Sequence, residues 1–151
     1  CMDSRTSAEL IFDQGLGDIF SLRIAGNVLN EDILGSMEFA TKVVGTKVIL
    51  VLGHTRCGAI TGACDGVQLG HLTGVLARVH PAIEAEAKDG FTGDGKNKEF
   101  VNRVTERNVR LTMARIHFES PIIRELEEAG QVKIVGGVYS VESGSVHFFE
   151  D

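Results

Sequence analysis

Two short stretches hold residues whose types and spacing could bind a metal ion. The chain begins with CMDSR, which places a cysteine, an aspartate and an arginine at positions 1, 3 and 5. The stretch GHTRCGA at residues 53–59 adds His54 and Cys57. Thiolate sulfur and imidazole nitrogen are ligands that zinc binds readily in proteins. We therefore predict that the two stretches form one zinc site, although GHTRCGA alone is equally compatible with a core histidine and a buried free cysteine.

A histidine and one cysteine hold zinc poorly, so a third ligand is needed. Cys64 is the nearest candidate in sequence. If residues 58–66 are helical, Cys64 lies about 10 Å from Cys57 along the axis, at about 1.5 Å per residue. A zinc–sulfur bond measures only about 2.3 Å. We expect Cys64 to pack as a small apolar residue, which leaves Cys1 as the third candidate.

The spacing inside CMDSR suggests how its three functional residues are presented. In an extended strand, side chains two positions apart point to the same face. If the chain is extended here, Cys1, Asp3 and Arg5 face the zinc together. That arrangement would supply a ligand, a carboxylate near the metal and a cation that restrains the carboxylate.

The elements that must position these residues alternate between strands and helices. Apolar, β-branched runs that end in glycine predict strands over residues 18–26 and 46–53, and residues 131–150 predict two strands joined by a turn at 142–144. Helices are predicted over 30–44, 71–87 with a kink at Pro81, 97–118 and 120–130, with a loop over 88–98. This order predicts an α/β fold with a mostly parallel sheet flanked by helices and a C-terminal hairpin strand. His54 and Cys57 follow strand 46–53 at its carboxyl end, where such sheets bind ligands.

Length, charge and cysteine count narrow the class of protein. A chain of 151 residues is expected to form a single domain, residues 1–151. The net charge of -6 argues against nucleic acid and against an anionic membrane surface as partners. The sequence contains no run of about 18 apolar residues, so it predicts no membrane-spanning helix. Three cysteines are too few for a disulfide scaffold and favour the reducing cytoplasm, with the periplasm left open because any signal peptide would precede Cys1.

Together, the two stretches resemble the signature of the β-class carbonic anhydrases, Cys-x-Asp-x-Arg followed by His-x-x-Cys. The similarity continues through FSLRIAGN (20–27), GSMEFA (35–40) and IVGGVYSVESGSVHFF (134–149). The resemblance implies three zinc ligands, an acid–base pair beside the metal and an apolar pocket for carbon dioxide. These are, respectively, Cys1, His54 and Cys57; Asp3 and Arg5; and Phe20 and Ala25. Arg23 and Asn27 lie in the similar region and are expected to be structural.

The resemblance also implies a function and an assembly. It implies zinc-dependent, reversible hydration of carbon dioxide to bicarbonate and a proton, with one zinc per chain in a homodimer or higher even-numbered homo-oligomer. Two alternatives stay open: a carbonyl sulfide or carbon disulfide hydrolase on the same scaffold, and a non-catalytic zinc-binding module. In the family a strand and a helical arm precede the first cysteine, and we expect the single domain of residues 1–151 to lack both.

Overall fold

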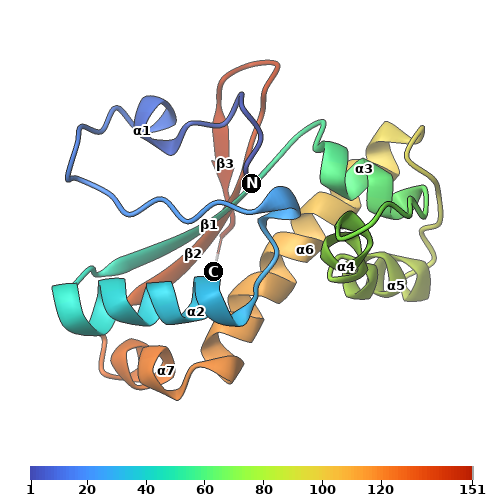
Figure 1. Ribbon diagram of the computed structural model, residues 1–151. Helices are drawn as coiled ribbons and strands as arrows, with labels where there is room; N and C mark the ends of the chain where they lie inside the picture. Colours follow the sequence, from blue (N-terminus) through green and yellow to red (C-terminus); the bar gives the residue numbers. More distant parts are fainter. Residues whose placement is uncertain (151) are drawn as a thin grey trace.

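The computed structural model describes residues 1–150 and contains one three-stranded sheet in the order β1-β2-β3. Strand β1 (Val48–His54) pairs in parallel with β2 (Lys133–Tyr139) along its whole length, so that His54 lies opposite Tyr139 (Figure 1). Strand β2 then pairs antiparallel with β3 (Val146–Phe148). These pairings confirm the predicted strand over 46–53 and the C-terminal hairpin.

Helical segments make up about half of the residues that the structure describes. In order they are α1 (Ala8–Ile11), a 3-10 turn η1 (Ala25–Asn27), α2 (Glu31–Glu38), a π-helical extension η2 (Phe39–Val44), α3 (Gly58–Cys64), α4 (Leu72–Ala77), α5 (His80–Lys88), α6 (Lys98–Glu119) and α7 (Pro121–Glu128). Side-chain oxygens of Asn30, Asn97 and Ser120 accept backbone hydrogen bonds where α2, α6 and α7 begin. Such caps satisfy N–H groups that have no partner within the helix, which explains why these helices start where the sequence predicts. None of the helices within residues 1–150 is long and apolar enough to cross a membrane.

Helix α6 divides the core into two clusters. One cluster joins the face of the sheet to α6 and α7 through side chains such as Val51, Val109 and Ile123. The other joins α6 to α3, α4 and α5, which gather beyond the end of β1 (Figure 1). Val51 belongs to the first cluster and Cys57 to the second, so the loop after β1 passes from one cluster to the other.

The strand predicted over residues 18–26 is wrong. Residues 19–24 carry no secondary structure, and Phe20 and Leu22 are 53% and 37% exposed. Strand β1 is an edge strand of the described sheet, and the segment lies across from it without pairing; together they line a cavity of about 720 Å³. A strand requires backbone hydrogen bonds to a neighbour, and an apolar run alone does not supply them.

The helix predicted over residues 71–87 is divided more sharply than a kink. Helix α4 ends at Ala77 and α5 begins at His80, with Pro81 as its second residue. Proline lacks the N–H that would continue a preceding helix but fits the first turn of a new one. Leu76 and Val79, three positions apart, are both buried in the core and hold this segment against it.

Candidate metal centre

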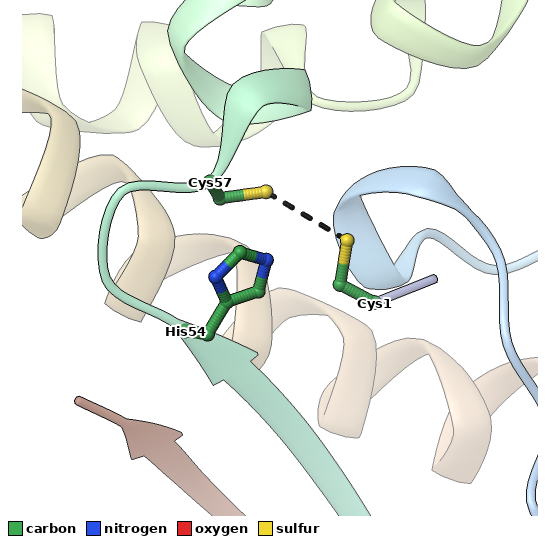
Figure 2. A group of neighbouring side chains, drawn as sticks. All are labelled: Cys1, His54 and Cys57. Carbon is green, nitrogen blue, oxygen red and sulfur yellow. Dashed lines mark hydrogen bonds between the residues drawn. The ribbon is translucent and has the colours of Figure 1, made fainter. Parts of the chain in front are cut away.

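Three segments bring together the cysteine and histidine side chains that the sequence predicts as ligands. His54 is the last residue of β1, Cys57 directly precedes α3, and Cys1 approaches them from the start of the chain. Their side chains face a common point, and the two sulfur atoms lie 3.9 Å apart (Figure 2). All three potential ligand atoms lie within 4.8 Å of one another. Among residues 1–150, this is the only group of three or more histidine, cysteine or acidic side chains that could hold a metal ion.

The imidazole of His54 is prepared to donate an electron pair. Its ring is 1% exposed, and Nδ1 lies 2.8 Å from the carbonyl oxygen of Thr55. Because a carbonyl oxygen only accepts, Nδ1 carries the hydrogen and Nε2 keeps its lone pair. Burial lowers the pKa of His54, which favours this neutral form.

The Nε2 atom of His54 has no hydrogen-bond partner among the described residues, although it is buried. A buried polar atom without a partner is costly and requires an explanation. A metal ion bound between Nε2 and the two sulfurs would satisfy it. Cys57 is buried, and Cys1 accepts a hydrogen bond from the backbone N–H of Gly26 at 3.3 Å. One nitrogen and two sulfur donors are a set that zinc accepts while keeping a fourth position open.

Cys64 does not take part in this group. It is the last residue of α3 and packs against the core cluster around that helix. Burial, followed by the nearby carboxylates of Asp65 and Asp94, raises the pKa of the Cys64 thiol to about 11. The prediction that Cys64 packs as an apolar residue is confirmed.

Asp3 and Arg5 form a salt bridge beside the three ligand atoms. Arg5 donates from Nε to Asp3 Oδ1 at 2.8 Å and from Nη2 to Oδ2 at 2.7 Å. These hydrogen bonds hold the pKa of Asp3 well below its ordinary value, so the carboxylate is ionised at neutral pH. Oδ2 of Asp3 lies 3.9 Å from Nε2 of His54. The carboxylate is thus next to the point where the ligand atoms converge.

The backbone that carries this pair is not the extended strand that the alternating pattern suggested. Residues 4 and 5 form a turn, closed by a hydrogen bond from the N–H of Thr6 to the carbonyl oxygen of Asp3 at 3.0 Å. The turn lets both the backbone N–H and the side chain of Arg5 bind the same carboxylate, the former at 2.9 Å. Arg5 therefore reaches Asp3 by bending back, and the expectation of a shared strand face is wrong.

Arg23 holds the segment that contains Cys1 and Asp3, which confirms the expectation that it is structural, although its residue type and spacing did not reveal which segment it holds. It donates from Nε to the carbonyl oxygen of Cys1 at 3.1 Å and from Nη2 to that of Asp3 at 2.6 Å. Nη2 also lies 3.2 Å from the hydroxyl of Thr6. The only signal for this role in the sequence is the position of Arg23 within FSLRIAGN.

The two residues predicted to line a substrate pocket lie in different surroundings. Phe20 borders the cavity of about 720 Å³, which Cys1 and His54 also line, and contacts Phe39 edge-on with ring centres 6.5 Å apart. Ala25 begins the turn η1 and does not border that cavity. Their role in binding substrate stays a prediction.

Comparisons with known proteins agree with this geometry. A family model described as Carbonic anhydrase matches residues 1–146. Carbonic anhydrase 2 of Mycobacterium tuberculosis is 40% identical over 149 residues, which cover 95% of this chain and 69% of that protein. The carbonic anhydrase of Mycolicibacterium smegmatis is 36% identical over 151 residues, covering 97% of this chain and 70% of that protein.

Solved structures show the same fold. A tetrameric β-carbonic anhydrase from Sordaria macrospora superimposes with a TM-score of 0.88 at 25% identity, covering all of this chain and 78% of that one. The carbonic anhydrase of Streptococcus mutans gives a TM-score of 0.66 at 29% identity, covering 99% of this chain and 78% of that one. Since the family model spans nearly the whole chain and a curated relative is 40% identical over 149 residues, the chain belongs to the carbonic anhydrase family, in its β-class.

Proposed function

We propose that this chain catalyses the reversible hydration of carbon dioxide to bicarbonate and a proton, with zinc held by Cys1, His54 and Cys57. The observation that carries the proposal is the buried, unpartnered Nε2 of His54, which faces two cysteine sulfurs beside the Asp3–Arg5 pair. Family membership supports the same reaction. When bound at such a site, zinc lowers the pKa of a coordinated water molecule and so supplies a nucleophile near neutral pH.

The residues around the metal centre have three roles: binding the metal, orienting a water molecule and restraining the Asp3 carboxylate. The three ligands bind through two sulfurs and one nitrogen, and the Thr55 carbonyl fixes the ring of His54 so that Nε2 faces them. The ionised carboxylate of Asp3 can only accept hydrogen bonds, and it would orient a water molecule at the fourth position toward carbon dioxide. Arg5 holds this carboxylate by two side-chain hydrogen bonds, which would keep the carboxylate from occupying the fourth position itself.

The test is stopped-flow hydration of carbon dioxide by the zinc-loaded, full-length protein. We expect saturable turnover that increases toward alkaline pH. Two thiolates give the metal more negative charge than imidazoles do, so the pKa of a water molecule bound there should be higher than in an all-imidazole site. Carbonyl sulfide is assayed in parallel with the same preparation. Fast turnover of carbonyl sulfide beside negligible hydration of carbon dioxide would overturn the proposal, and so would a fourth protein ligand on the metal at every pH tested.

We also propose that the chain assembles as a homodimer or a higher even-numbered homo-oligomer. The related Sordaria macrospora enzyme is described as tetrameric. Large apolar side chains are exposed along the first part of the chain, including Leu10, Leu16, Phe20 and Phe39. Phe20 and Phe39 are in edge-on contact, and contiguous exposed apolar surface commonly marks an interface. Light scattering of the full-length protein should give an even multiple of the protomer mass, and a monomer mass would contradict the proposal.

A further inference from the structure

The loop between two of the proposed ligands contains only Thr55 and Arg56, and its backbone is unusual. Arg56 has a φ angle of 53°, in the left-handed region that residues other than glycine seldom adopt. Such a conformation persists only where the surroundings hold it in place. The contacts that hold this loop therefore bear directly on where His54 and Cys57 point.

Those contacts come from the turn of the C-terminal hairpin. One carboxylate oxygen of Glu142 accepts a hydrogen bond from the Thr55 hydroxyl at 2.6 Å, and the other lies 2.5 Å from Nε of Arg56. The hairpin backbone adds two more bonds: Val141 N–H donates to the Thr55 hydroxyl at 3.1 Å, and Thr55 N–H donates to the Tyr139 carbonyl at 2.9 Å. The side chain of Glu142 thus binds both residues of the loop.

The carbonyl groups of both loop residues accept hydrogen bonds from residues of the proposed metal centre. The carbonyl oxygen of Thr55 accepts the Nδ1 hydrogen of His54 at 2.8 Å and so sets the orientation of its ring. The carbonyl oxygen of Arg56 accepts a hydrogen bond from Nη2 of Arg5 at 3.1 Å. The same Nη2 holds Asp3. The Glu142 carboxylate is therefore connected through Thr55 to the ligand His54, and through Arg56 to the Asp3–Arg5 pair.

We propose that Glu142 is a positioning residue for the metal centre: it holds the Thr55–Arg56 loop in the conformation that aims His54 and Cys57 at the ion and supports Arg5 beneath Asp3. Its ion pair with Arg56 is exposed, with side-chain exposures of 44% and 59%, and exposed pairs contribute little to global stability. The effect of Glu142 is thus local. Its consequence for carbon dioxide hydration rests on the proposed function, whereas its consequence for zinc affinity requires only that the three ligands bind zinc.

The test compares Glu142→Ala with a matched control, Glu119→Ala. Glu119 has the same exposure of 44% and pairs with Nε of Arg115 at the same 2.5 Å, on α6 and outside the metal centre. Zinc affinity is measured by chelator competition in the full-length protein, and the absorption spectrum of the cobalt-substituted form reports ligand geometry. We expect Glu142→Ala to weaken zinc binding by about tenfold, as loss of an outer-shell partner does, and to alter the cobalt spectrum. Glu119→Ala should change neither.

Two further variants separate positioning from general destabilisation. Glu142→Gln keeps a side-chain oxygen that accepts a hydrogen bond from Thr55, so it should retain most of the zinc affinity that Glu142→Ala loses. Arg56→Gly introduces a residue that adopts a positive φ freely, and in that background Glu142→Ala should cost clearly less affinity than in the wild type. If Glu142→Ala lowers zinc affinity equally in both backgrounds, Glu142 does not act through the conformation of the loop.

Zinc affinity and a cobalt spectrum of Glu142→Ala equal to those of Glu119→Ala would overturn the proposal. The proposed function fails separately, if the zinc-loaded wild type does not hydrate carbon dioxide. In that case a tenfold loss of zinc affinity in Glu142→Ala would still support the positioning role.

Discussion

Gly53 provides a sharp test of how the fold places His54. It precedes His54 in β1, and a Cβ atom added there would lie 2.8 Å from Cγ2 of Val109 and 3.0 Å from Cγ2 of Thr105. Both neighbours are fully buried on α6 and cannot turn toward solvent. Ordinary carbon–carbon contacts begin near 3.5 Å, so Gly53→Ala must move β1 and α6 apart by roughly 0.7 Å.

This overpacking should lower the free energy of unfolding by about 1–3 kcal/mol. It should also weaken zinc binding, because the displaced residue is the neighbour of a proposed ligand. Urea denaturation of the zinc-free protein measures the first effect, and chelator competition measures the second. Gly58→Ala is the control: Gly58 directly follows Cys57, has open space around its added Cβ, and should be neutral or gain about 0.4–1 kcal/mol.

A double-mutant cycle tests whether the contact with Val109 is the cause. Val109→Ala removes the methyl group that the new Cβ would strike, at a cost of its own because a core cavity forms. In that background the penalty of Gly53→Ala should become clearly smaller, since neighbouring substitutions that share a contact are not additive. A Gly53→Ala protein as stable as the wild type, or strict additivity in the cycle, would refute the reasoning.

Substitutions at three further residues test the metal centre and the core that supports it. Cys57→Ser should strip the metal, because a hydroxyl is a far weaker zinc ligand than a thiolate; full zinc occupancy by elemental analysis would contradict the ligand assignment. Arg5→Ala should keep zinc but lower carbon dioxide turnover by about a hundredfold, because the freed Asp3 carboxylate, 3.9 Å from His54 Nε2, can turn onto the metal. Arg5→Lys should restore only part of the turnover, since lysine lacks the planar guanidinium that binds both carboxylate oxygens. A structure of Arg5→Ala with Asp3 in its wild-type position, together with near-normal turnover, would exclude this role of Arg5. Glu86 is buried, and although burial opposes its ionisation, hydrogen bonds from arginines such as Arg107, at 2.7 Å, lower its pKa below the ordinary 4.5. The stability that it contributes is therefore present above pH 4.5 and lost as the pH falls through its folded pKa. Glu86→Gln should cost about 1–3 kcal/mol at pH 7, with a gap to the wild type that narrows in acid; a gap that is independent of pH in denaturation experiments would show that the charge is not the cause.

The exclusion of Cys64 and the starts of two helices could be predicted because they rest on local rules. Helical rise alone separates Cys64 from Cys57, and the structure places Cys64 in the core as expected. The caps at Asn30 and Ser120 are equally local, since each is a side chain that bonds the backbone three residues further on. The signature residues then indicated that Cys1, and not another residue, completes the group.

Features that depend on distant partners could not be predicted in this way. Residues 18–26 have the composition of a strand, but a strand exists only through its neighbour, which composition does not specify. The segment with the turn at residues 4 and 5 is also held by Arg23, which donates to the carbonyl oxygen of Asp3 from 20 residues away, and the alternating pattern does not reveal that partner. Glu142 gave no signal, because an exposed acidic residue in a hairpin turn is common and its partners lie more than 80 residues earlier.

The proposed metal centre therefore has two halves that are held by different forces. The backbone of His54 and Cys57 is fixed by strand pairing and by the buried clusters on either side of α6, and the loop between them is held in addition by Glu142. Cys1 and Asp3 belong to a segment with no strand pairing, and their backbone is held by hydrogen bonds from Arg23. Packing yields little to small changes, whereas hydrogen bonds at a partly exposed site open at lower cost. Adjustment of the centre, when metal or substrate binds, should accordingly occur on the side of Cys1 and Asp3.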